Sequence, residues 1–135
     1  MAVGLFLRAY KAEIYFPYGH DNDLAGWVIK DIVVNGHLRL IGQETSTQGI
    51  FIGALYYYLL IPFYLLTNFD PVGSILLYVI LGMFGIWSFY FVFKTVFKKQ
   101  EVGLIAAFVS AVSYSIVMND RGTVPTTPVI IWSVW

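Results

Sequence analysis

The stretch Val72–Phe93 constrains the fold most, because it is almost unbroken apolar sequence and matches the roughly 20 helical residues needed to cross a bilayer. Asp70-Pro71 precedes it, and proline suits the first position of a helix, while aspartate suits the N-cap before it. The basic turn Lys94–Lys99 follows. The sequence therefore predicts a membrane helix over about residues 71–97.

A second apolar span, Val102–Met118, begins shortly after the basic turn, which predicts a second membrane helix over about 101–118, antiparallel to the first. The positive-inside rule places the lysine turn in the cytoplasm and the residues before the first span on the outer face. The chain is 59% hydrophobic and only 12% charged, with a mean hydropathy of +0.73, which is typical of membrane proteins. The expected fold class is all-α, as a fragment of a multi-pass protein of the plasma membrane.

Both ends of the chain run into apolar sequence, so residues 1–135 are expected to be the N-terminal part of a single polytopic membrane domain. Its expected parts are the end of a first membrane helix (1–7), an outer loop with interfacial helices (8–70), the two membrane helices, and the start of another segment (128–135).

Two helices are expected within the outer loop. Leu24–Val34 has an apolar helical side and is followed by Gly36 at a C′ position. Ile50–Leu66 is short for a membrane helix, contains Pro62, and carries a tyrosine cluster that favours the headgroup layer. We therefore expect Ile50–Leu66 to be helical and to lie at the interface without crossing the bilayer.

Charge and composition limit the partners and cofactors. The formal net charge is zero and no basic tract occurs, so the sequence gives no indication of a nucleic-acid partner. The absence of cysteine excludes disulfides and thiolate metal sites. His20 lacks further ligands at useful spacing, so no cofactor is indicated, and a divalent metal at His20 stays as an alternative.

The first candidate site is the cluster His20-Asp21-Asn22-Asp23, which lies close to membrane-grade sequence. Carboxylates at the edge of a bilayer are costly, because lipid does not replace their lost hydration. Asp21 and Asp23 are two residues apart and do not share a helix face, so one of them is predicted to point into a site as a general base. A helix N-cap is the alternative role for each.

Two further polar groups follow. Arg39, Gln43 and Glu44 form the second, and an arginine in a loop at the membrane edge suits a phosphate, with snorkelling to the headgroups as the alternative. Asp120 and Arg121 form the third, with capping and anchoring of a helix as the alternative. All three groups fall on one side of the predicted membrane. The predicted substrate- or phosphate-binding residues are therefore Arg39, Glu44, Asp120 and Arg121.

The order of several motifs resembles a known family. These are a Leu-x-Gly loop in Gly36–Gly42, the Tyr-Tyr-Tyr-Leu-Leu-x-Pro-Phe-Tyr segment in Gly53–Tyr64, and Asp70-Pro71 before an apolar span and a basic turn. In this order they resemble the N-terminal part of bacterial type C glycosyltransferases, the relatives of protein O-mannosyltransferases and of the lipid A aminoarabinose transferase. The resemblance covers nearly all of this chain, but only the first elements of a much longer family fold.

The resemblance implies an inverting transfer of a sugar from a polyprenyl-phosphate donor in the membrane lipid to a hydroxyl of a glycan, lipid or protein acceptor outside the cytoplasm. It implies an aspartate of the first outer loop as base, which Asp21 matches best and Asp23 second. Arg121 stands where many relatives carry an arginine that assists the phosphate. Some relatives have a second loop acid where this chain has Thr126-Thr127-Pro128. A two-acid mechanism would therefore need Asp120 in that role.

Two other interpretations stay open. One is a non-enzymatic membrane subunit of a cell-envelope assembly machine. The other is an ion-coupled transporter with Asp21 or Asp120 as the coupling carboxylate. Transporter carboxylates usually lie at mid-membrane within broken helices, whereas these two are expected in loops, so the transporter ranks last.

Overall fold

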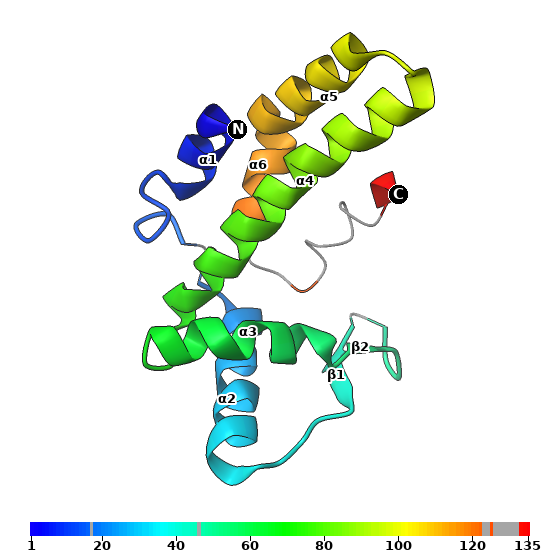
Figure 1. The fold of residues 1–135 in the computed structure, drawn as a ribbon. Helices are drawn as coiled ribbons and strands as arrows, with labels where there is room; N and C mark the ends of the chain where they lie inside the picture. Colours follow the sequence, from blue (N-terminus) through cyan, green and yellow to red (C-terminus); the bar gives the residue numbers. More distant parts are fainter. Residues whose placement is uncertain (17, 46, 123–124, 126–132) are drawn as a thin grey trace. The chain divides into compact units, whose positions relative to one another are not determined.

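The computed structural model describes residues 1–16, 18–45, 47–122, 125 and 133–135, and over these residues the chain is mostly helical (Figure 1). Its elements are α1 (Ala2–Ala9), α2 (His20–Asn35), β1 (Ile41–Glu44), β2 (Phe51–Gly53), α3 (Leu55–Leu66), the 3-10 turn η1 (Pro71–Gly73), α4 (Ser74–Phe97), α5 (Gln100–Val112) and α6 (Tyr114–Arg121). They form two compact units, Met1–Pro17 with Tyr78–Trp135, and Tyr18–Leu77. Residues 126–128 and most of the predicted segment 128–135 lie outside the described residues.

The predicted first span is confirmed as a long helix. Asp70 caps η1 by accepting a hydrogen bond from the Val72 amide at 2.9 Å, and Pro71 takes the first helical position. The 24 residues of α4 rise by roughly 36 Å at about 1.5 Å per residue, more than the roughly 30 Å of a hydrocarbon core. Lys98 then adopts a left-handed φ of 53°, which turns the chain into α5 (Figure 1). The predicted hairpin of apolar helices is therefore present.

The predicted second helix over 101–118 is corrected, because it is broken into α5 and α6 with a bend of 57°. Ser113 lies at the break with an extended backbone (φ −60°, ψ 120°). An extended residue cannot continue the ladder of i to i−4 bonds, so carbonyls of the last turn of α5 lose their helical donors.

α1 packs against α5 and α6 in the same unit (Figure 1). Gly4 permits this packing, because a Cβ on it would overlap the end of the Ile86 side chain and lie 3.4 Å from Ala111. The apolar stretch predicted to end a helix at residue 7 is thus a short helix that reaches Ala9 and includes Arg8.

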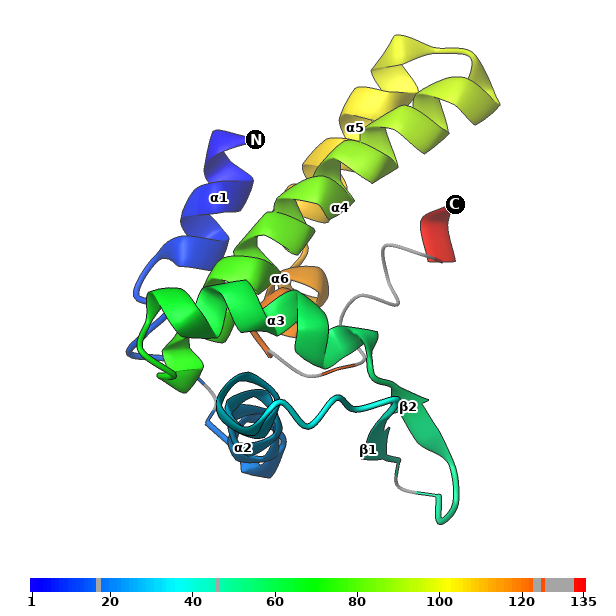
Figure 2. The ribbon, with the colours of Figure 1, turned by 60° about the horizontal axis from the view of Figure 1, so that its bottom comes forward.

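In the second unit, α2 packs on α3 (Figure 2). The helix predicted over Leu24–Val34 lies inside α2, and Gly36 follows α2 with a left-handed φ of 70°, as predicted. Ile29, Leu60 and Tyr64 have no exposed surface and form the centre of this packing. Burial of these large side chains gives the second unit a hydrophobic core that stabilises the packing of α2 on α3.

The outer-loop segment Ile50–Leu66 is helical only from Leu55 onward. The 12 residues of α3 rise by about 18 Å, too little to cross a bilayer by themselves. The part that was expected to be helical, Ile50–Gly53, instead contributes β2, which pairs antiparallel with β1. Gly49, with φ of 82°, supplies the left-handed residue that the connecting turn needs. The all-α expectation is therefore corrected by one short hairpin.

Candidate functional site

Asp21 and Asp23 both lie in the first turn of α2, where the helix dipole favours negative charge. The N-cap is Gly19, so the alternative that either aspartate is the N-cap is wrong. Asp21 is half-buried, and its Oδ1 accepts a hydrogen bond of 2.6 Å from Gln43 Nε2. Asp23 is exposed and accepts one of 3.1 Å from the Tyr18 hydroxyl. As predicted from their spacing, the two carboxylates have different surroundings.

Arg39 is held in place by α2 and α3. Its Nη2 donates to Asp31 Oδ2 at 3.2 Å, while its backbone exchanges two hydrogen bonds with the Tyr58 hydroxyl, at 3.1 and 2.8 Å. Hydrogen bonds from Asn35, His37 and Arg39 hold the pKa of Asp31 below its ordinary value. The other guanidinium nitrogens of Arg39 make no hydrogen bond within the described part of the chain, and half of the side chain is exposed.

Tyr57 is affected electrostatically by both Asp21 and Arg39. Its side chain is 2% exposed, and this burial raises the pKa of Tyr57, with Arg39 opposing the rise and Asp21 adding to it. Both charges therefore act on the same phenol. The charges of Asp21 and Arg39, 18 positions apart in sequence, thus act on one buried side chain in the second unit.

Glu44 takes part in the hairpin itself. Its Oε1 accepts a hydrogen bond of 2.7 Å from the Gly49 amide, on the far side of the turn. This contact explains why an acid suits the position without any ligand. Substrate binding by Glu44 stays a prediction.

Asp120 and Arg121 lie in the other unit and contact α1. Asp120 Oδ2 accepts from Arg8 Nε at 2.7 Å, and the Arg8 and Asp120 side chains are only 1% and 10% exposed. Arg121 donates to the carbonyls of Leu7 and Tyr10 at 3.3 and 3.1 Å. Both residues lie in α6 and not in a loop. A loop position is therefore no reason to reject Asp120 as the coupling carboxylate of a transporter. The Asp120 carboxylate, however, already forms an ion pair with Arg8.

Two arginines from different helices donate to carbonyls at helix ends. Arg8, from α1, donates to the carbonyls of Ser110 and Ala111, at 3.4 and 3.3 Å, which the break after α5 leaves without helical donors. Arg121, from α6, donates to carbonyls at the end of α1. Cations at helix C-termini also interact favourably with the helix dipole. Arg8 was not predicted as a site residue, but a charge directly after apolar helical sequence indicates a buried partner.

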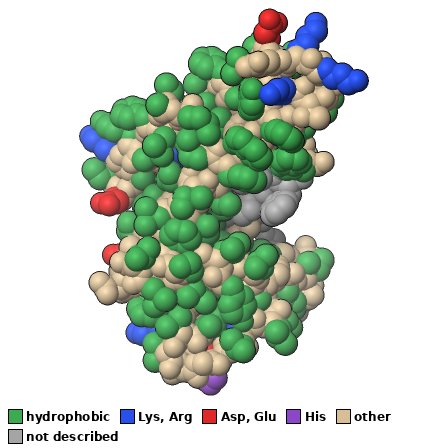
Figure 3. Space-filling model, in the orientation of Figure 1, with side chains coloured by type: hydrophobic (Ala, Val, Ile, Leu, Met, Phe, Trp, Pro, Cys, Tyr) green, Lys and Arg blue, Asp and Glu red, His purple; other side chains and the backbone are tan. Residues whose placement is uncertain are grey.

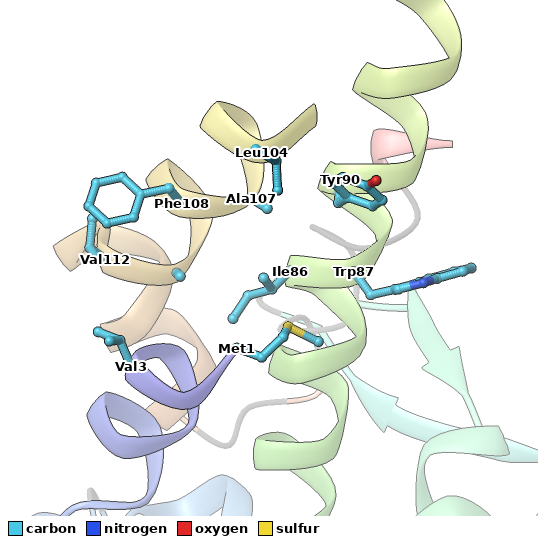
Figure 4. A pocket seen from close by; sticks show the side chains of 10 residues that line it. Met1, Val3, Ile86, Trp87, Tyr90, Leu104, Ala107, Phe108 and Val112 are labelled. Atoms are coloured by element: carbon cyan, nitrogen blue, oxygen red, sulfur yellow. The ribbon is translucent and has the colours of Figure 1, made fainter. Parts of the chain in front are cut away.

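The first unit also contains an apolar groove of about 490 Å³ (Figure 4). Side chains from α1, α4 and α5 line it, among them Val3, Ile86 and Phe108. Among the described residues that line it, Tyr90 carries the one ionisable side chain, so the groove is mainly an apolar surface.

No group of three or more His, Asp or Glu side chains suited to a metal ion occurs among the residues that the structure describes. Within the same residues, α4 with its preceding turn is the one helix long and apolar enough to cross a membrane, and the bent pair α5–α6 adds a second if it forms one span. No family model, curated protein or solved structure matches the chain.

Proposed function

We propose that this chain is the N-terminal part of a membrane glycosyltransferase, and that Asp21 is its general base. The enzyme transfers a sugar, with inversion, from a polyprenyl-phosphate donor to an acceptor hydroxyl on the outer face of the membrane. The observation that carries the proposal is the state of Asp21: one carboxylate oxygen is held by Gln43 at 2.6 Å, and the other makes no hydrogen bond among the described residues. An oriented carboxylate with one oxygen available is what a general base requires.

In the proposed reaction, the acceptor oxygen attacks the anomeric carbon of the sugar while its proton passes to Asp21. The bond between that carbon and the phosphate oxygen breaks, and the electron pair leaves with the polyprenyl phosphate. The negative charge that grows on the leaving phosphate requires a cation.

Arg39 suits this phosphate better than Arg121. Arg39 uses one guanidinium nitrogen for Asp31 and is half exposed, whereas Arg121 uses two nitrogens for carbonyls of α1. A planar guanidinium with donors to spare binds phosphate through paired hydrogen bonds. We therefore assign the phosphate to Arg39 and the joining of α1 to α6 to Arg121.

The membrane setting is supported by the surface of the first unit. Only 33% of the most apolar window of α4 is buried, although a core helix of a soluble protein is mostly covered. Hydrophobic side chains cover the visible face of the α4–α5 hairpin, and charged side chains gather at its turn (Figure 3). Lipid would cover this apolar surface.

The test is Asp21→Asn in the full-length protein, which keeps the shape of the side chain and an acceptor for Gln43 but removes the base. Membranes containing the enzyme are supplied with undecaprenyl-phosphate mannose, glucose or galactose carrying a radiolabel, and transfer to envelope acceptors is measured. We expect a loss of roughly 10²–10⁴-fold in rate with unchanged membrane insertion. Asp23→Asn should be milder, because Asp23 contacts only Tyr18 among the bonds described.

The pattern across the two variants decides the assignment. Near-native transfer by Asp21→Asn, together with loss in Asp23→Asn, would move the base by two residues. Near-native transfer by both variants would contradict the glycosyltransferase proposal for this loop.

A further inference from the structure

Gln43 reaches Asp21 because of an irregularity in the β hairpin. Ile41 pairs with Gly53 and Glu44 pairs with Phe51, so Gly42 and Gln43 together lie opposite a single residue of β2. This is the arrangement of a β-bulge, which redirects a side chain and is over-represented next to active sites.

Gly42 makes this bulge possible. A Cβ on Gly42 would overlap the Ile52 carbonyl oxygen and lie 2.9 Å from that of Gly53. Only glycine lets the two backbones approach so closely, and this approach sets the position of the next residue, Gln43. The bulge leaves Gln43 half-buried, with its amide directed at the first turn of α2.

The hydrogen bond from Gln43 to Asp21 suits a residue that orients a reactive carboxylate. Gln43 Nε2 donates to Asp21 Oδ1 across 22 positions of sequence, at 2.6 Å and in a partly buried setting. The amide is neutral, so it fixes the carboxylate without forming an ion pair that would hold both oxygens. Glu44, the next residue, bonds instead within the hairpin to Gly49, so the link to α2 depends on Gln43.

We infer that Gln43 is a positioning residue that orients the Asp21 carboxylate toward the acceptor hydroxyl. This inference rests on the proposed role of Asp21 as base. Gln43 acts through Asp21 and does not itself exchange a proton. Small errors in the placement of a reacting group are costly, since a misplacement of about 1 Å lowers a rate by roughly 10²-fold.

The experiment compares Gln43→Met, Gln43→Glu and Asp21→Asn in the full-length enzyme with the labelled polyprenyl-phosphate sugars. Gln43→Met keeps the length of the side chain and removes the hydrogen bond, so we expect kcat to fall roughly ten- to hundred-fold with KM within about twofold. Gln43→Glu places two carboxylates within hydrogen-bond distance. Such a pair holds one proton to higher pH, so the rate profile should move to more alkaline pH.

Thr45→Val is the matched control for a merely loosened hairpin. It removes the Thr45 hydroxyl, which accepts a hydrogen bond from the Thr47 amide and donates one to the Thr47 carbonyl in the turn. We expect it to keep kcat near the parent value. An equal fall of kcat in Thr45→Val and Gln43→Met would assign Gln43 to hairpin stability and overturn the inference.

The variants also separate this inference from the proposed function. If Asp21→Asn is inactive while Gln43→Met keeps its kcat and Gln43→Glu keeps the parent pH profile, Asp21 stays the base and the positioning role is refuted. If Asp21→Asn is fully active, the proposed role of Asp21 as base fails, and the role of Gln43 fails with it. If Gln43→Met does not fold, the pH profile of Gln43→Glu, which retains the volume of glutamine, decides the matter.

Discussion

Removal of the Asp120 charge should destabilise the first unit severely. In Asp120→Asn the guanidinium of Arg8 stays 1% exposed but loses its only anionic partner within the described residues. The remaining bonds of Arg8 go to neutral carbonyls, which do not compensate a full charge. Breaking a buried ion pair from one side costs about 3–5 kcal/mol, or at least a hundred-fold in the ratio of folded to unfolded protein.

The measurement is equilibrium unfolding of the full-length protein in mixed micelles, followed by tryptophan fluorescence. Replacing both partners, as in Arg8→Met with Asp120→Leu, should recover much of the loss, because apolar pairs replace buried ion pairs with little cost. Asp31→Asn is the control for a more exposed pair, because the Arg39 and Asp31 side chains are 51% and 24% exposed, and it should change stability little. A free energy of unfolding for Asp120→Asn within about 1 kcal/mol of the parent value would refute the reasoning.

Three further predictions follow from single features. Gly82→Ala should lower the stability of the first unit by about 1–3 kcal/mol in the same unfolding assay, because its Cβ would lie 2.5 Å from the Arg8 guanidinium, whereas Gly53→Ala meets nothing within 4 Å and serves as the control. The pKa of Asp31 is lowered in the folded protein, so the Asp31 carboxylate stabilises the folded loop fully at a pH above its ordinary pKa of 3.8, and this stabilisation is lost as the pH falls through the lowered pKa. Amide hydrogen exchange of the residues after α2 should therefore become faster in that acidic range, and Asp31→Asn should not show this increase. Single cysteines should be labelled by an impermeant reagent at Lys30, which is exposed on α2, and not at Lys98 in intact cells, and the reverse result would contradict the predicted topology.

The parts of the fold that sequence predicted are those set by local chemistry. Val72–Phe93 had to be helical because of its length and composition, and Asp70-Pro71 and Gly36 marked ends through caps that involve only near neighbours. The same reasoning predicted a helix over Leu24–Val34 with Asp21 or Asp23 near its N-terminus, and both lie in the first turn of α2. It failed for Ile50–Gly53, whose apolar residues suit a strand as well as a helix, since periodicity in so short a run does not separate them.

The parts that were missed depend on distant residues. The break at Ser113 is supported by Arg8, which lies more than 100 positions earlier in the chain. The hydrogen bond between Gln43 and Asp21 depends on a β-bulge that no local sequence pattern predicts. Pairings of this kind are decided by tertiary packing, and a charge pattern indicates only that some partner is needed.

Arg8 supports the break between α5 and α6. A helix that breaks leaves the carbonyls of its last turn without helical donors. Here Arg8 donates to two of them, so the bend of 57° is supported by side-chain hydrogen bonds. α6 therefore runs in a different direction from α5, and its last residue, Arg121, is attached to the end of α1.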